Sequence, residues 1–214
     1  MSNNVTILDY GFGNVFSLAN ALKFLNLNVD ISSDPNHLIK SDRIIITGVC
    51  AFKACMDKMK EKGLDEFLIR YAELGRPILG ICIGMQILFD SSNEFSECKG
   101  LSLIKGDIKE IPKKTKEGKN LKIPHMGWSE LLPVNNTDYW DDGIMKSIRP
   151  SMSAYFAHSY SAQNMNAENV VAETFYGGNK LNAVVRNDNI FGCQFHPEKS
   201  HNLGLKILKN FLYI

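Results

Sequence analysis

A cysteine between two glycines lies where an apolar segment meets a helical pattern. Residues 77–79 are apolar and continue into Gly80-Ile81-Cys82-Ile83-Gly84. This layout matches a nucleophile elbow with sulfur in place of oxygen, whose tight turn leaves no room for a Cβ at either glycine position. The free N–H groups and the dipole of the following helix would stabilise a thiolate at Cys82. A buried structural cysteine is the alternative, but it would not need the two glycines.

A candidate base for this cysteine lies near the C-terminus. His196 precedes Pro197, which favours an extended backbone, and side chains two residues apart in an extended segment point the same way. Glu198 can therefore orient the imidazole of His196. In such a triad the imidazole takes the thiol proton and later gives it to a leaving amine, while the carboxylate fixes the tautomer. His-Pro-Glu alone also fits a turn after a strand, but together with the elbow it predicts nucleophilic catalysis by Cys82.

Residues 80–86 and 195–198 resemble the class I (triad) glutamine amidotransferases, which hydrolyse glutamine and pass the ammonia to a synthase. Three further segments, at residues 9–14, 124–128 and 155–160, are similar to the glutaminase subunits of imidazole glycerol phosphate synthase. The resemblance covers the chain end to end. It implies L-glutamine as the substrate, no metal or organic cofactor, and a heterodimer with a (β/α)8-barrel cyclase subunit of histidine biosynthesis, which receives the ammonia.

Hydrolysis of a carboxamide also needs donors for the oxyanion. The N–H of Ile83, directly after the nucleophile, is one candidate, and the loop with Val49 and Cys50 is well placed to give another. The related enzymes have Pro-Gly-Val-Gly here, whereas residues 47–50 read Thr-Gly-Val-Cys. The Cβ of Cys50 could restrict a peptide flip that glycine allows. Alternatively, Cys50 simply adopts the same backbone conformation as glycine. We also expect Cys50 to lie close enough to Cys82 for oxidation to join the two sulfurs.

The resemblance assigns further roles by position. The implied substrate contacts are Gly48, Gln86, Ser159 and Tyr160. The implied contacts with the cyclase subunit are Asn14, Ser17, Trp128, Tyr155 and Lys199. For Gln86 the alternative is an ordinary exposed amide on a helix. His125 and His158 are better explained as hydrogen-bonded structural or interface histidines, because the motif already assigns the base to His196.

Composition and charge fit a globular enzyme. The chain has 214 residues, of which 44% are hydrophobic and 22% charged, and its net charge is +1. This charge gives no reason to expect nucleic acid or an anionic membrane as a partner. Lysines gather at residues 113–119 among polar residues, which indicates a solvated loop. Five cysteines without metal-ligand spacing argue against zinc or a disulfide framework. No apolar run reaches membrane-spanning length, so we expect a cytoplasmic protein.

Strand patterns alternate with helical patterns along the first half of the chain. Strands are expected at residues 5–9, 28–33 and 43–47, and helices at residues 15–26, 52–62, 64–74, 83–90 and 201–213. Further strands are expected at residues 101–111, 128–134, 153–160, 170–176, 180–187 and 190–195. This order predicts an α/β fold, with an open, mostly parallel sheet, helices on both faces and a β-rich C-terminal half. One domain, residues 1–214, is the default expectation.

Two other functions are compatible with the sequence. A paralogous glutaminase could supply ammonia to a different synthase, such as a sugar amidotransferase system in surface-glycan assembly, and the unusual residues Thr47 and Cys50 favour it. A docking subunit without catalytic activity is the other possibility, and the intact triad argues against it.

Overall fold

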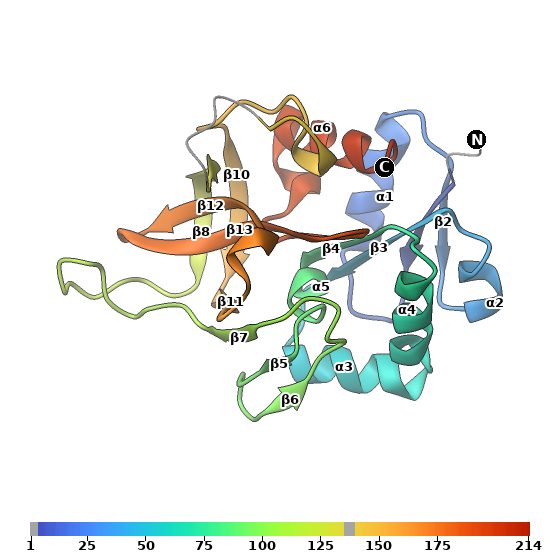
Figure 1. Cartoon of the computed structure of the whole chain (residues 1–214), viewed down its shortest axis with the longest axis horizontal. Coiled ribbons are helices and arrows are strands. Elements are labelled where there is room, and N and C mark those ends of the chain that lie inside the picture. Colours follow the sequence, from blue (N-terminus) through green and yellow to red (C-terminus); the bar gives the residue numbers. More distant parts are fainter. Residues whose placement is uncertain (1–3, 135–139) are drawn as a thin grey trace.

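The computed structural model describes residues 4–134 and 140–214 (Figure 1). Its main sheet has eight strands in the order β2-β1-β3-β4-β14-β13-β12-β9. The first five of these are parallel and the remaining pairs are antiparallel. In chain order the strands are β1 (Val5–Leu8), β2 (Val29–Ser32), β3 (Arg43–Gly48), β4 (Ile78–Cys82), β9 (Leu132–Pro133), β12 (Val170–Tyr176), β13 (Asn179–Asn187) and β14 (Ile190–Cys193).

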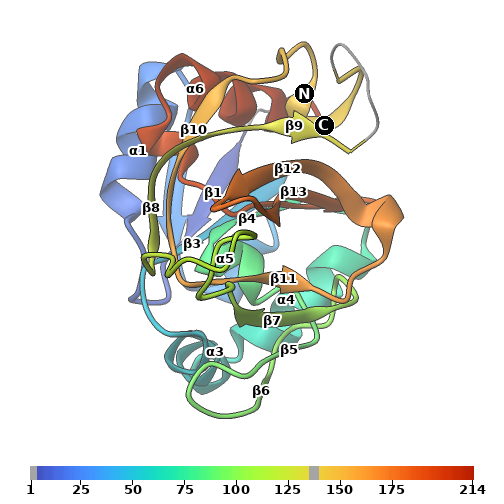
Figure 2. The ribbon, with the colours of Figure 1, turned by 90° about the vertical axis from the view of Figure 1, so that its left-hand side faces the viewer.

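Helices cover both faces of this sheet (Figures 1 and 2). One face carries α1 (Val15–Phe24) and α6 (His201–Phe211). The other carries α3 (Phe52–Glu61), α4 (Leu64–Glu73) and the short α5 (Ile83–Gln86). The central strands β1, β3 and β4 are almost wholly buried, as expected for a parallel sheet covered on both faces. The predicted fold class is confirmed.

The strand register brings the candidate site residues to one edge of the sheet. Gly48, the last residue of β3, pairs with Cys82, the last residue of β4. On the other side of β4, Cys193 of β14 pairs with Ile81. In open α/β sheets ligands bind at the carboxyl ends of the parallel strands. His196 lies three residues beyond β14, so it follows a strand end at the same edge as Cys82.

Two smaller sheets form the rest of the β-rich half. One pairs β8 (His125–Glu130) with β10 (Ser153–His158), and the other has the order β11-β7-β5-β6. Its strands are β5 (Ser91–Ser92), β6 (Cys98–Lys99), β7 (Asp107–Glu110) and β11 (Tyr160–Gln163). The chain leaves β10 at His158 and enters β11 at Tyr160, so Ser159 lies at the junction of these sheets. Short helical turns are α2 (Pro35–Leu38), η1 (Gly143–Met145), η2 (Ala167–Asn169) and η3 (Pro197–Lys199).

Two expected elements are shorter in the structure. The helix expected at residues 83–90 ends at Gln86, because the loop after β6 takes the carbonyl groups that would extend it. Leu101 donates to Ile87, and Leu103 donates to Leu88. The strand expected at residues 101–111 is reduced to β7 for the same reason, since its first residues serve this loop. α2, which begins at a Pro after the capping residue Asp34, was not predicted.

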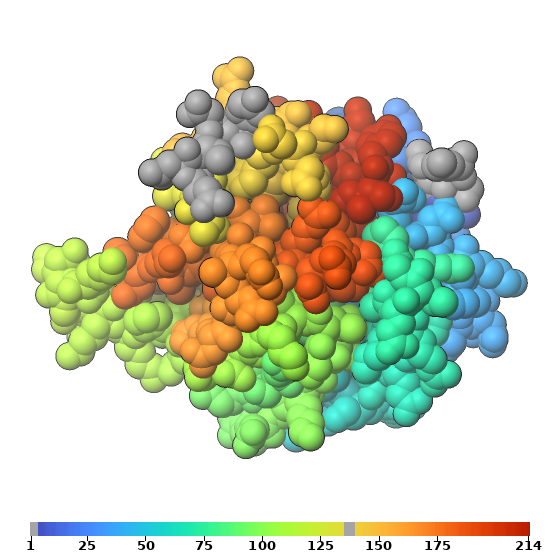
Figure 3. Space-filling model, in the orientation of Figure 1, coloured from blue at the N-terminus to red at the C-terminus, as the bar shows by residue number. Residues whose placement is uncertain are grey.

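The lysine cluster at residues 113–119 lies in an arm that projects from the body (Figure 3). The arm closes on itself through a bridge between Lys114 and Asn120 and is held by the turn after β12, where Gly177 accepts from Lys116. This placement agrees with the predicted solvated loop. No helix within residues 4–134 and 140–214 is long and apolar enough to cross a membrane.

Candidate active site

Cys82 lies on a strained turn between β4 and α5. Its φ is 56° and its ψ is −112°, a conformation that non-glycine residues rarely adopt and that clusters at functional sites. A Cβ on Gly80 would overlap the carbonyl of Gly84, and a Cβ on Gly84 would overlap the carbonyl of Ile46 in β3. Both glycines are therefore required by close backbone approaches. The turn has the geometry that the sequence predicts for a nucleophile elbow.

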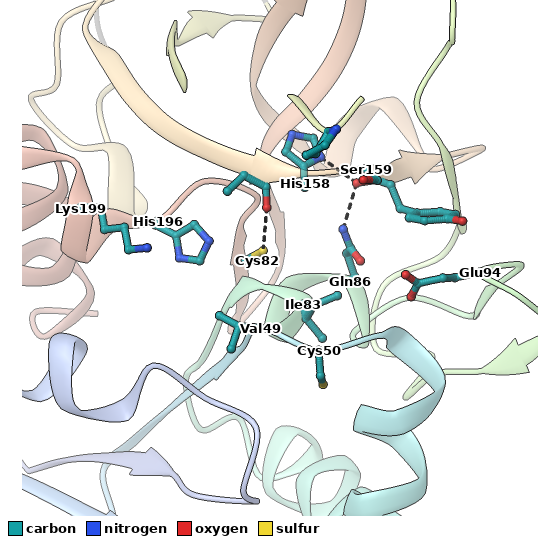
Figure 4. A pocket seen from close by; sticks show the side chains of 13 residues that line it. Val49, Cys50, Cys82, Ile83, Gln86, Glu94, His158, Ser159, His196 and Lys199 are labelled. Carbon is teal, nitrogen blue, oxygen red and sulfur yellow. Dashed lines mark hydrogen bonds between the residues drawn. The ribbon is translucent and has the colours of Figure 1, made fainter. Parts of the chain in front are cut away.

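The predicted base lies beside the cysteine and is held from both sides. His196 faces Cys82 (Figure 4), and its Nδ1 lies 2.9 Å from Glu198 Oε1, whose side chain is fully buried. The His196 backbone N–H donates to the carbonyl of Tyr155 at 2.9 Å, and the Ser200 hydroxyl donates to the His196 carbonyl at 2.7 Å. Ser200 in turn accepts from the N–H of Tyr155 at 3.0 Å. Ser200 therefore supports the base, a role that the sequence reasoning did not assign.

The surroundings favour a protonated imidazole at His196. Burial by itself lowers the pKa of His196, but its interactions with Cys82 and Glu198 outweigh burial and raise the pKa to about 10. A protonated imidazole beside sulfur stabilises a thiolate, the reactive form of cysteine. The three side chains therefore have the arrangement of an activated nucleophile, its acid–base partner and the group that orients that partner.

A pocket of about 350 Å³ opens beside the Cys82 sulfur (Figure 4). Its lining includes the predicted catalytic, oxyanion and substrate residues Val49, Cys50, Cys82, Ile83, Gln86, Ser159, Tyr160 and His196. It also includes Glu94, Pro124, Ala157, His158 and Lys199. The structure thus collects residues from well-separated segments of the chain at one cavity. Gly48 does not line the pocket; a Cβ there would overlap the hydroxyl of Tyr10 and crowd Ile83.

Gln86 is a buried part of this site, not an exposed helix amide. Its Nε2 donates to the Tyr160 carbonyl at 2.9 Å and to Gln194 Oε1 at 3.1 Å. Both N–H groups of the amide are therefore used by the protein. The amide oxygen points away from the Tyr160 carbonyl (Figure 4), so Gln86 offers an acceptor to a ligand in the pocket.

Glu94 was missed by the sequence reasoning. It lies in the loop between β5 and β6 and reaches the pocket wall, where its Oε2 accepts from the backbone N–H of Phe52 at 2.6 Å, at the start of α3. No local motif around residue 94 marks it, because the loop that carries it comes to the pocket only through tertiary folding. Its carboxylate gives the pocket an anionic wall that suits an ammonium group.

The oxyanion loop differs from the expectation at one position. The N–H of Val49 donates to the carbonyl of Phe12 at 3.1 Å, so it is not free to bind an oxyanion in this conformation. The preceding peptide is fixed as well, because the Tyr10 hydroxyl donates to the carbonyl of Thr47 at 2.9 Å. Ile83 is the first residue of α5, so its N–H has no helical acceptor and remains a candidate donor.

Cys50 does not face Cys82, contrary to the expectation that the two sulfurs lie close together. Its side chain points away from Cys82 (Figure 4) and its thiol interacts with that of Cys55. Ala51 caps α3, so Cys50 and Cys55 occupy the two positions that pack together in a hydrophobic staple, just before the cap and four residues after it. Cys50 therefore ties the oxyanion loop to α3. Its backbone is not in the left-handed region, so the Cβ is tolerated in this conformation.

Three predicted interface residues gather on the surface beside the pocket. Trp128 stacks on His201 at a centroid distance of 4.9 Å and meets Tyr155 edge to face at 5.9 Å. The Lys199 ammonium lies 5.8 Å from the centre of the Tyr155 ring. Trp128 is 48% exposed in spite of these contacts. Ser17 shares a second hollow with Lys199 and His201, so four of the predicted residues are neighbours.

The fifth predicted interface residue, Asn14, lies directly before the N-terminal end of α1. Exposed apolar side chains lie next to these residues in the sequence or line the pocket, namely Phe12, Phe16, Val49, Met126 and Trp128. Exposed apolar side chains around a pocket are typical of a protein interface.

Within the described residues, no group of three or more His, Cys, Asp or Glu side chains could hold a metal ion.

Comparison with known proteins places this geometry in a family. Residues 6–214 match the family model "Glutamine amidotransferase class-I". The chain is 39% identical over 212 residues to "Imidazole glycerol phosphate synthase subunit HisH 1" of Legionella pneumophila (strain Lens), covering 99% of this chain and 100% of that protein. It is 40% identical to the HisH subunit of Wolinella succinogenes (98% and 99% covered) and 38% identical to that of Bacillus cereus (97% and 93% covered).

Solved structures support the fold. A structure described as "Crystal structure of glutamine amidotransferase" superposes with a TM-score of 0.72 at 17% identity, covering 98% of this chain and 97% of that one. "Structure of PurLQS from Thermotoga maritima" gives a TM-score of 0.68 at 22% identity, covering 100% and 99%. At these identities the likeness concerns the fold alone.

Proposed function

This chain belongs to the class-I glutamine amidotransferases, and from that premise we propose that it is the glutaminase subunit of an imidazole glycerol phosphate synthase. It hydrolyses L-glutamine to glutamate and ammonia. The ammonia passes to a (β/α)8-barrel cyclase subunit, which forms imidazole glycerol phosphate and AICAR in the cytoplasm. The observation that supports the glutaminase activity is the buried Cys82–His196–Glu198 arrangement, which lies at the edge of a pocket of about 350 Å³ with polar side chains in its lining.

The first chemical step is attack of the Cys82 thiolate on the side-chain amide carbon of glutamine. The protonated His196 then gives its proton to the departing ammonia, which leaves a γ-glutamyl thioester on sulfur. Glu198 keeps the imidazole oriented and compensates its charge through the 2.9 Å contact at Nδ1. In the second step His196 takes a proton from water, which attacks the thioester and releases glutamate.

The amino-acid end of glutamine fits the far end of the pocket. The Gln86 amide oxygen and the Glu94 carboxylate are both acceptors there and suit the α-ammonium group. Ser159 and Tyr160 line the same wall and suit the α-carboxylate through hydroxyl and backbone donors. This orientation directs the side-chain amide toward Cys82.

The structure gives a reason for tight control by the partner. Ile83 at the start of α5 offers one donor to the oxyanion, whereas the Val49 N–H is bound to Phe12. A donor from Val49 requires the loop at residues 48–50 to reorient, and loss of one oxyanion donor costs on the order of 10²–10³ in rate. Docking of a partner against the apolar surface around Trp128, which includes Phe12 and Val49, would supply the means to move this loop.

The test compares glutamate release by the chain alone, with purified cyclase subunit, and with the cyclase plus the cyclase's own nucleotide substrate. We expect the last condition to raise glutamine turnover by about a hundredfold or more, the worth of one oxyanion donor. Full activity of the chain alone would contradict control by a partner. The Cys82→Ala variant is the control, since it must be inactive in every condition.

The identity of the acceptor is the finer part of this proposal. The relatives with 38–40% identity over nearly the whole chain support a cyclase, whereas Thr47 and Cys50 in the oxyanion loop support a paralogue that serves another synthase. The two differ in the same assay. A glutaminase of another system would release glutamate but would not respond to the cyclase, and a docking subunit without activity would release none.

A further inference from the structure

Two buried histidines outside the triad lie at the wall of the glutamine pocket. His125 in β8 and His158 at the end of β10 are directly opposite each other in the strand register. His158 lines the pocket, and His125 lies behind it with its side chain out of solvent. Neither histidine takes part in the chemical steps at Cys82.

The hydrogen-bond partners indicate which ring nitrogens carry a proton and which do not. His158 Nδ1 lies 2.8 Å from the carbonyl of Tyr160, which can only accept, so Nδ1 carries a proton. Burial lowers the pKa of His158 to about 3, and this effect outweighs the hydrogen bond to Tyr160, which raises the pKa. The ring is therefore neutral, and its Nε2 accepts a hydrogen bond. The partner of Nε2 is His125 Nδ1 at 3.2 Å, which must therefore donate.

His125 is protonated on the same ring nitrogen as His158. Burial lowers the pKa of His125 to about 4, so this ring is also neutral and its Nε2 has no proton. Ser129 Oγ lies 2.9 Å from that nitrogen and must donate its hydroxyl proton to it. The result is a one-directional chain of donors, from Ser129 through His125 and His158 to the Tyr160 carbonyl.

Aromatic rings prevent the His125 imidazole from turning. It stacks on Phe156 at a centroid distance of 4.8 Å and on Tyr176 at 4.1 Å, with interplanar angles of 17° and 23°. A ring held between two others keeps its nitrogens aimed along the chain. Phe156 is itself packed against Phe195, next to the catalytic base.

The end of the chain shapes the substrate wall. The Tyr160 carbonyl accepts from His158 and also from Gln86 Nε2 at 2.9 Å. Because His158 bonds to the carbonyl two residues later, it closes a ring around Ser159 at the junction of the two small sheets. The orientation of the Gln86 amide, and hence the acceptor it presents to the ligand, depends on where that carbonyl lies.

We propose that Ser129, His125 and His158 form a neutral hydrogen-bond chain that positions Tyr160 and Gln86 for glutamine binding. All three are positioning residues that act through Tyr160. The proposal rests on the proposed function for the identity of the ligand. Ser129 follows Trp128 in β8, so the hydrogen-bond chain joins the strand that carries this predicted interface residue to the pocket.

The direct test is the tautomer of each ring in the native protein. With ¹⁵N-labelled histidine, protonated and unprotonated ring nitrogens give separate NMR signals, and we expect both His125 and His158 to be neutral with the proton on Nδ1. His37, which is half exposed on α2, provides the signal of a histidine outside this hydrogen-bond chain for comparison. A charged ring at neutral pH, or a proton on Nε2 of either buried histidine, overturns the proposal even if glutaminase activity is normal.

The functional test uses variants that keep or remove one donor, assayed for glutamine turnover in the complex with its activating ligand. His158→Ala removes the donor to Tyr160 and should raise the glutamine KM about tenfold, with a smaller change in kcat. In His158→Asn the amide nitrogen occupies the place of Nδ1, so the KM should return to within about threefold of the native value. Ser129→Ala should raise the KM by about threefold, since it removes the first donor.

The control is His37→Ala, which should leave the KM unchanged. If His158→Asn is as impaired as His158→Ala, or if the KM is unchanged in both His158→Ala and Ser129→Ala, the histidines only fill space. A native complex without any glutamine turnover would instead refute the proposed function, and the NMR result would still decide whether the chain exists.

Discussion

The carboxylate of Glu198 offers the sharpest quantitative test of the triad. The pKa of His196 is raised to about 10 in the folded protein. Compared with the ordinary histidine value of about 6.5, this amounts to about 5 kcal/mol in favour of the protonated ring. Cys82 and Glu198 provide that preference against the cost of burial. Replacing Glu198 by Gln keeps the size and an acceptor but removes the charge, so roughly half of it, about 2 kcal/mol, should be lost.

For Glu198→Gln we therefore expect a fall in kcat of about thirtyfold or more. The glutamine KM should change little, because Glu198 does not line the pocket. His196→Ala and Cys82→Ala should lose far more, since those side chains exchange the proton and form the bond. The assay is glutamate release at saturating glutamine in the activated complex.

The pH dependence has a definite sign. Because folding raises the pKa of His196, the imidazolium and its stabilising contacts are present at neutral pH and are lost as the pH rises through about 10. In Glu198→Gln the loss of activity at alkaline pH should begin at a lower pH than in the native enzyme. An alkaline limb that does not move, or a loss as large as that of His196→Ala, would refute the reasoning.

Three further outcomes can be measured on the same protein. Gly84→Ala should lower the free energy of unfolding by about 1–3 kcal/mol in chemical denaturation, because the new Cβ overlaps a β3 carbonyl; native-like stability would show that the elbow has room to spare. Trp128→Ala should weaken binding of the cyclase subunit by about thirtyfold in calorimetry, whereas the equally exposed Phe175 on β12 should be replaceable by Ala without effect. Cys50→Gly should raise the glutamine turnover of the isolated chain, because it removes both the contact with Cys55 and the Cβ, and Cys50→Ala should raise it less; equal rates in the two variants would show that the Cβ does not restrict the loop.

The features that sequence could predict are those set by local geometry. A tight turn that excludes a Cβ requires glycine at fixed positions, so Gly80 and Gly84 are enough to predict the elbow at Cys82. The extended backbone before Pro197 likewise predicts that Glu198 reaches the ring of His196. The order of strands and helices is predictable for the same reason, since each element carries its own periodicity.

Features that depend on distant partners were not predictable. α5 ends at Gln86, and a loop some fifteen residues later donates to the carbonyl groups of Ile87 and Leu88 just beyond it, which nothing within the helix signals. The Val49 N–H is occupied by Phe12 through a contact between two loops. The orientation of Cys50 is different, because the staple positions around the start of α3 are local and would have indicated Cys55 as its neighbour.

The central claim is that Cys82 supplies ammonia from glutamine to a partner that carries out the synthesis. The most direct measurement compares product formation by the complex of the cyclase with native chain and with Cys82→Ala, using either glutamine or ammonium salt as the nitrogen source. We predict that Cys82→Ala abolishes synthesis from glutamine and leaves synthesis from ammonia intact. Glutamine-dependent synthesis that survives in Cys82→Ala would contradict the assignment of the nucleophile.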